Sequence, residues 1–178
     1  MKLDFCRISG FALVGLVAFT SGFSVNDADA ATTRLEKFFD NWKVECRDDE
    51  KTKNCALVFA LLEKKSKRVV FSWTVSKDTE AKNLDMALIR TPTGVLLPDG
   101  VSVSFAGSEA VSVPFKTCGP RGCIAELKLD DQWLKALGSQ ETMSIAYKSV
   151  RGQDINHEIT LKTFSEAYAF YKSEIGTQ

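Results

Sequence analysis

Apolar and polar residues alternate along most of the chain with the two-residue period that is typical of β-strands. Between residues 41 and 47, Trp42, Val44 and Cys46 share one face of the predicted strand, and polar residues occupy the other. Polar, glycine-containing or proline-containing connections separate such segments. The pattern predicts strands at 41–47, 55–62, 69–75, 101–105, 111–115, 123–129, 143–147 and 155–161.

Two segments have helical spacing instead. Asp130 is placed to cap a short helix that runs through Leu137 and ends at Gly138. A second helix is predicted to begin at Thr163 or Ser165 and to run to 175, before a glycine. Its apolar positions recur every three or four residues, at Phe164, Ala167, Tyr168, Tyr171 and Ile175.

About eight short strands with two peripheral helices predict an all-β sandwich. Segment 55–62 is apolar on both faces, which indicates either a central strand covered on each side or the middle of a sandwich sheet. No internal repeat or linker divides the pattern, so we expect a single domain over 31–178.

The first thirty residues have the pattern of a signal peptide for export. Lys2 and Arg7 precede an uncharged apolar core at 11–19, and an A-x-A cleavage site follows at 28–30. An uncleaved membrane anchor is the alternative, but glycine, serine and threonine residues interrupt the apolar stretch. We therefore expect cleavage of 1–30, export to the periplasm, the outer-membrane surface or the medium, and no transmembrane segment in the mature chain.

Charge and composition exclude several classes of function. The chain has 23 basic and 23 acidic residues; residues 1–30 hold two and three of these, which leaves 21 and 20 in the mature chain. This balance argues against a nucleic-acid partner and against bulk attraction to anionic membranes. A single histidine removes most histidine-based metal sites, and we expect no metal or cofactor.

Cleavage would remove Cys6 and leave four cysteines, an even number that predicts two disulfides in an exported chain. Three connectivities are possible. We favour Cys46–Cys55 and Cys118–Cys123, because each pair flanks a short polar or Gly/Pro connection that a turn can close. Each bond would contribute roughly 2–3 kcal/mol in the chain-entropy model. The spacing fits neither a thioredoxin-type redox pair nor a four-cysteine zinc site.

The segment 63–68 is the dense basic run of the chain and joins two predicted strands. Its cations are Lys64, Lys65, Lys67 and Arg68. A solvated hairpin tip is the ordinary interpretation, and the functional one is a contact point for phospholipid head groups or acidic host glycans. Acidic residues at 48–50, in the neighbouring connection, are expected to offset the positive field.

His157 lies on the apolar side of its predicted strand. The structural interpretation is a half-buried side chain with a backbone hydrogen bond, and the functional one is a catalytic base or pH switch. No serine or cysteine nucleophile in a recognisable turn context accompanies it. The residues themselves therefore favour a non-enzymatic protein.

Several motifs also resemble a known family. Residues 41–46 have a W-x-V-x-C strand, with Cys55 after a polar gap, and 94–101 have the layout of a P-x-G-x-x-L-P-x-G segment. Residues 114–125 match F-x-x-C-x-x-x-G-C-x-A. Over about residues 38–172 the chain resembles the invasion-associated locus B family of exported bacterial proteins, although Ala-Tyr replaces Gly-Phe in the closing S-x-x-G-F element at 165–168.

The resemblance implies an immunoglobulin-like β-sandwich with one short internal helix and a C-terminal helix. It also implies structural roles for Trp42 and the four cysteines, and no catalytic residues. Founding members are linked to invasion of host cells, notably erythrocytes, whereas many relatives occur in free-living bacteria.

We expect a non-enzymatic interaction domain of the bacterial envelope, with a role in host-cell invasion or in envelope function. A hydrolase that uses His157 and a carrier of a small ligand or lipid between the two sheets are the alternatives. The expected partner is an unknown protein or an envelope or host-surface component, and the expected state is a monomer or weak homo-oligomer.

Overall fold

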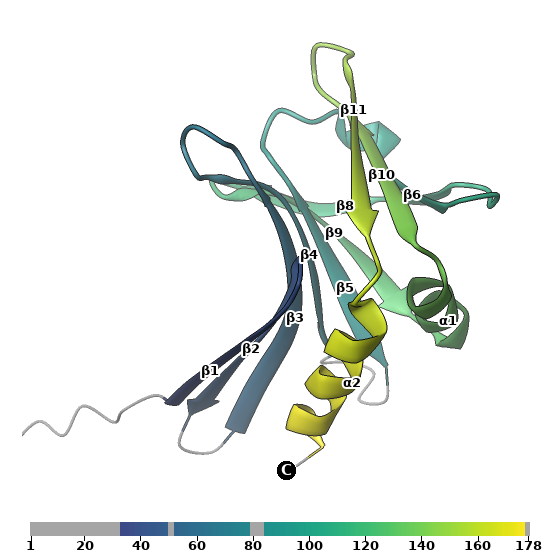
Figure 1. Ribbon diagram of the computed structural model, residues 1–178. Helices are drawn as coiled ribbons and strands as arrows, with labels where there is room; N and C mark the ends of the chain where they lie inside the picture. Colours follow the sequence, from purple (N-terminus) through teal and green to yellow (C-terminus); the bar gives the residue numbers. More distant parts are fainter. Residues whose placement is uncertain (1–32, 50–51, 79–83, 177–178) are drawn as a thin grey trace, which may run out of the picture. The chain divides into compact units, whose positions relative to one another are not determined.

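The computed structural model describes residues 33–49, 52–78 and 84–176, and the predicted signal peptide lies outside them. Within the described residues, eleven strands form two antiparallel sheets (Figure 1). The larger sheet has the order β1-β2-β3-β4-β5-β9-β8 and the smaller one β11-β10-β6-β7. The predicted all-β sandwich is confirmed.

The bounds of the elements are as follows. The larger sheet contains β1 (Thr33–Phe39), β2 (Trp42–Asp49), β3 (Thr52–Leu62), β4 (Val69–Lys77), β5 (Asp85–Thr91), β8 (Phe115–Gly119) and β9 (Gly122–Leu129). The smaller sheet contains β6 (Val101–Phe105), β7 (Val111–Val113), β10 (Thr142–Lys148) and β11 (Asp154–Thr160). The helices are the single 3-10 turn η1 (Leu97–Asp99), α1 (Asp131–Ser139) and α2 (Phe164–Ile175).

The core lies on one face of the larger sheet, where the predicted apolar stripes meet. Because successive side chains of a strand point to opposite faces, β2, β3 and β4 each present alternate residues to this face. Fully buried side chains there include Trp42, Leu57, Phe71 and Trp73, and the smaller sheet supplies Val103, Met143, Ile145 and Ile159. Full burial of such a side chain stabilises the fold by about 1.5–3 kcal/mol.

Helix α2 covers the rest of the same face, over β1, β2 and β3 (Figure 1). Trp42 marks the boundary between the smaller sheet and α2. Its indole Nε1 donates to the carbonyl oxygen of Thr160, at the end of β11, over 3.0 Å, and its ring centroid lies 5.1 Å from that of Phe164. The Thr163 hydroxyl donates to the carbonyl oxygen of Phe39 over 2.7 Å, which joins the start of α2 to β1.

Both predicted helices are confirmed. The Asp130 carboxylate accepts a hydrogen bond from the backbone N–H of Trp133 over 2.9 Å, as an N-cap should. Helix α1 continues one residue past Gly138, to Ser139, and α2 ends at Ile175 with Gly176 as its cap.

The sequence pattern did not predict β1 or β5. The inward face of β5 carries Asp85, Ala87, Ile89 and Thr91, all buried, so two of its four inward positions are polar. The outward face carries Met86 and Leu88, which are half-buried. Because both faces mix apolar and polar residues, the strand lacks the apolar alternation on which a strand prediction depends.

The predicted strand 111–115 is two strands in different sheets. β7 ends at Val113 in the smaller sheet, and β8 begins at Phe115 in the larger one. Pro114 separates them. Because proline has no N–H to donate to a ladder, the chain leaves one sheet and enters the other at this residue.

Two interpretations of segment 55–62 were open: a strand covered on both faces, or a strand in the middle of a sandwich sheet. The second is correct. Cys55, Leu57 and Phe59 face the core, whereas Ala56 and Val58 are only half-buried on the outer face. None of the described elements covers that face. The outer apolar residues pack against their neighbours in adjacent strands instead.

Candidate functional site

The basic run lies at the turn between β3 and β4, which we call the basic tip (residues 63–68). Two backbone hydrogen bonds close it, from Glu63 N–H to the Arg68 carbonyl and from Lys67 N–H to the Glu63 carbonyl, each of 2.9 Å. Lys67 has a φ of 57°, the left-handed conformation that lets the chain reverse here. The Ser66 hydroxyl also bonds to the Glu63 carboxylate. The turn is therefore a defined structure.

All four cations of the basic tip are exposed: Lys64, Lys65, Lys67 and Arg68. Among the described residues, none of them has a partner in an ion pair. Glu63 is the one acid in the turn, and Ser66 binds its carboxylate. The tip thus presents a surplus of positive charge to solvent.

Two aliphatic residues lie at the base of the basic tip. Leu62 and Val69 pair across β3 and β4, and they are 53% and 51% exposed. Aliphatic side chains of strands normally pack against a neighbour or the core, so the exposure of this pair is unusual. Together with the exposed cations above it, the pair forms an amphipathic surface.

Asp48 is too far from the tip to offset its field, so for this residue the expectation was wrong, and residue 50 lies outside the described residues. β2 ends at Asp49 and β3 begins at Thr52, at the other end of the hairpin from residue 63. β3 has 11 residues, so at about 3.3 Å per residue the two turns are separated by roughly 33 Å. The Debye length at physiological ionic strength is only about 8 Å.

His157 is half-buried, as predicted, but its partner is a side chain and not the backbone. Its Nε2 lies 3.1 Å from the Tyr147 hydroxyl, and its ring centroid lies 5.2 Å from that of Phe71. Burial lowers the pKa of the His157 imidazole and raises the pKa of the Tyr147 hydroxyl. A neutral phenol is a poor nucleophile at neutral pH, so this pair does not form the Ser–His or Cys–His arrangement of a hydrolase.

The structure pairs the four cysteines of the described residues across adjacent strands. Cys46 and Cys55 face each other in β2 and β3, with an S–S distance of 2.09 Å. Cys118 and Cys123 face each other in β8 and β9, with an S–S distance of 2.08 Å. Each bond links the two strands of a hairpin on the side of its turn, and the thiols are therefore structural.

Asp85 is a buried charge that the sequence did not single out. Its side chain accepts hydrogen bonds from the hydroxyls of Tyr168 and Tyr171 and from the Lys172 ammonium, the last two over 3.2 Å. Burial raises the pKa of both tyrosines, and the Asp85 carboxylate raises them further. All three donors belong to α2, so this cluster attaches the helix to β5 and is a structural element.

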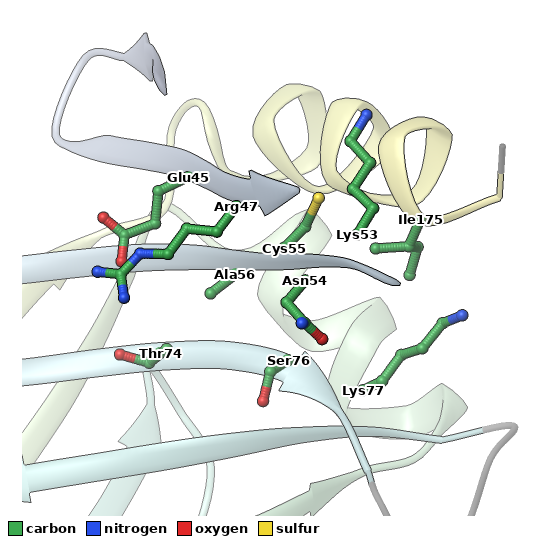
Figure 2. A pocket seen from close by; sticks show the side chains of 10 residues that line it. All are labelled: Glu45, Arg47, Lys53, Asn54, Cys55, Ala56, Thr74, Ser76, Lys77 and Ile175. Atoms are coloured by element: carbon green, nitrogen blue, oxygen red, sulfur yellow. The ribbon is translucent and has the colours of Figure 1, made fainter. Parts of the chain in front are cut away.

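A depression of about 540 Å³ lies on the sheet near the start of β3 (Figure 2). Side chains from β2, β3, β4 and the end of α2 line it, among them Glu45, Arg47, Asn54, Ser76 and Ile175. Glu45 pairs with Lys43 over 2.7 Å, and Lys53 at its rim pairs with Glu174. Two of its four charged side chains, Glu45 and Lys53, are thus in ion pairs, unlike the cations of the basic tip.

Neither a metal-binding cluster nor a membrane-spanning helix occurs among the described residues. Among them, no three or more His, Cys, Asp or Glu side chains are grouped so as to hold a metal ion. No helix in this part of the chain has the length and apolar character needed to cross a membrane.

Two sheets, two helices and two pairs of bonded cysteines define a disulfide-containing β-sandwich domain. The model of a protein family described as invasion associated locus B (IalB) protein matches residues 42–172 of this chain. The match covers well over half of the chain, and the chain belongs to this family.

Individual relatives agree with this assignment. Invasion protein B homologues of two Brucella abortus strains, 2308 and biovar 1 strain 9-941, are each 24% identical over 148 residues, which is 83% of this chain and 84% of theirs. The crystal structure of invasion associated protein B from Bartonella henselae superposes with a TM-score of 0.67 at 20% identity, and covers 78% of this chain and 95% of that one. The sandwich fold is therefore shared.

Proposed function

We propose that this chain is an exported protein of the bacterial envelope, that it binds a partner without catalysing a reaction, and that it contacts an anionic surface through the basic tip. The observation that carries the proposal is the basic tip itself. Four exposed cations are held on a defined turn that contains one acid, Glu63, and Asp48, near the far end of β2, lies roughly 30 Å away along β3.

Export is supported by the signal-like residues 1–30 and by the two cysteine pairs, because disulfides persist in oxidising compartments. The names of the Brucella and Bartonella relatives refer to invasion. We propose the corresponding role here, contact with the surface of a host cell or of the bacterial envelope, as the biological setting of the basic tip.

The contact is electrostatic. Each lysine or arginine near an anionic surface contributes at most about 1 kcal/mol to binding, and salt screens this contribution. Four cations on one turn therefore allow binding that is weak at physiological salt and stronger at low salt. The chemistry of the surface is phosphate, sulfate or carboxylate.

The test replaces Lys64, Lys65, Lys67 and Arg68 together by Gln in the purified protein. Binding to vesicles that contain phosphatidylglycerol, and to heparin, is measured across a salt titration. We expect at least about a tenfold loss of binding to one of these surfaces at 50 mM salt, and a smaller loss at higher salt.

The matched control removes the same charge elsewhere. Lys77, Lys128, Lys135 and Lys162 are also exposed and lie outside the basic tip. Their replacement by Gln should leave binding close to that of the parent. Equal weakening by both variants would show that only net charge matters, and unchanged binding by the tip variant would show that the tip is solvated surface.

A further inference from the structure

A second amphipathic turn connects β10 and β11. The turn between β10 and β11, residues 149–153, carries Val150, which is 65% exposed, and Arg151. Residues 94–97 run alongside it: Val150 N–H donates to the Gly94 carbonyl and Leu96 N–H to the Lys148 carbonyl, each over 2.8 Å. Leu97, at the end of this segment, is 51% exposed. Aliphatic and cationic side chains thus occur together here as well.

The two turns project from the same end of the sandwich. Trp42 contacts Thr160 of β11, and Phe71, which is closer to the basic tip, packs on His157. β11 therefore runs away from the tip as the chain proceeds, and the turn that precedes it lies at the tip end. Figure 1 shows both turns at the upper end of the domain, opposite α2.

Exposed aliphatic side chains concentrate at this end. Among the described residues, five large apolar side chains are more than half exposed: Phe38, Leu62, Val69, Leu97 and Val150. Four of them belong to the segments 62–69, 94–97 and 149–153, which we call the docking end. These segments also carry five cations, the four of the tip and Arg151, against one acid, Glu63. An electrostatic contact alone does not account for the aliphatic residues.

We propose that the anionic surface is a lipid bilayer, and that the docking end stands on it with Leu62, Val69, Leu97 and Val150 at the boundary between head groups and acyl chains. This inference rests on the proposed function. A bilayer offers anionic head groups and an apolar phase at one depth, which matches cations around exposed aliphatic residues. A sulfated or carboxylated glycan offers the charges but no apolar phase.

The experiment compares three variants on phosphatidylcholine vesicles with 30% phosphatidylglycerol, and on heparin. The variant Leu97→Ser with Val150→Ser should bind the vesicles about tenfold more weakly, and this loss should persist at high salt because it is not electrostatic. Its binding to heparin should not change. The Gln variant of the basic tip should lose binding mainly at low salt, and Leu84→Ser, at the opposite end of the larger sheet, should resemble the parent.

A depth measurement separates insertion from surface contact. In Val150→Trp, lipids brominated in the acyl chains should quench the added fluorescence, whereas Leu84→Trp should show only the quenching of the parent. The far-UV spectra of all variants serve as a check of the fold.

The possible failures are distinguishable. Loss of vesicle binding in the Gln variant, with no effect of the Ser pair and no quenching at position 150, keeps the anionic contact and overturns insertion. Binding of the parent to heparin but not to vesicles also overturns the bilayer and keeps the proposed function. Absence of binding to both surfaces at low salt overturns both.

Discussion

The two ends of the larger sheet hold charge in different environments. At the end covered by α2, Asp85 is 3% exposed, and three donors from one helix surround its carboxylate. At the docking end, the cations of the basic tip have no ion-pair partner among the described residues and face solvent. A buried charge requires partners because desolvation is costly, whereas an exposed one remains available to a ligand.

This difference indicates what each end does. The charged cluster around Asp85 belongs to the stability of the fold, and its removal should unfold the protein more easily. Under the proposed function the basic tip serves recognition, and its removal should leave the fold intact. The two ends also have one disulfide each, Cys46–Cys55 near α2 and Cys118–Cys123 near the docking end, which allows the same comparison.

The largest effect should come from Asp85→Ala. This change leaves the buried Tyr171 hydroxyl and its neighbours without their acceptor, and we expect a loss of about 3–4 kcal/mol in the free energy of unfolding. Urea denaturation followed by far-UV circular dichroism measures it. Asp99→Ala, at an exposed carboxylate near Lys148, is the control and should cost less than about 0.5 kcal/mol. Similar losses in the two variants would contradict a special role for Asp85.

Removal of the disulfides should cause the next largest losses in the free energy of unfolding. Removal of Cys46–Cys55 by double substitution with Ala should cost roughly 3 kcal/mol, and removal of Cys118–Cys123 roughly 2 kcal/mol, because the first bond closes the longer loop. Cys46 is also buried, whereas Cys118 is exposed, so the first change loses more packing. Non-reducing peptide mapping tests the pairing directly, and a peptide that joins Cys46 to Cys118 or Cys123 would rule it out.

A smaller effect concerns pH. Burial lowers the pKa of His157 below its usual value, so the unfolded chain takes up this proton at a higher pH than the folded one. Stability should therefore fall as the pH falls below about 6.5. Solvent still screens the half-buried imidazole, and we expect less than about 1 kcal/mol.

Thermal unfolding between pH 7 and pH 5 should show a flatter dependence in His157→Gln than in the parent. The same variant tests the hydrolase alternative. A hydrolytic activity that disappears in His157→Gln while the fold persists would overturn the non-enzymatic proposal.

The smallest effect on stability should come from the basic tip. Replacement of its four cations by Gln should change the free energy of unfolding by less than about 0.5 kcal/mol, because exposed charges contribute little to folding. Denaturant unfolding of the same samples used for vesicle binding makes the comparison direct. A loss above about 1 kcal/mol would mean that the tip belongs to the fold, as Asp85 does.

Much of the fold was predictable because its signals are local. Trp42, Val44 and Cys46 alternate with polar residues, and Asp130 precedes an amphipathic segment, so each element is encoded within a few neighbouring positions. The cysteine pairing was also accessible, since residues near one turn meet across a hairpin. The basic run could be located in the sequence for the same reason.

What depended on distant residues was not predictable. β5 buries Asp85 because α2, some eighty residues later in the chain, supplies Tyr168 and Tyr171 as partners. Which strands become neighbours also decides where the chain passes from one sheet to the other, at Pro114. It likewise decides that His157 contacts Tyr147.

The sequence alone determined the β-sandwich class, the two helices and the presence of a basic hairpin, because periodicity, capping and charge act over short distances. Only the tertiary structure decided which turns share an end of the domain. It placed Val150 and Leu97 at the same end as Leu62 and Val69, and it directed the end of β2, with Asp48, to the other end (Figure 1). The direction of each strand within the stacked sheets sets this arrangement, and that direction follows from contacts between residues far apart in the chain.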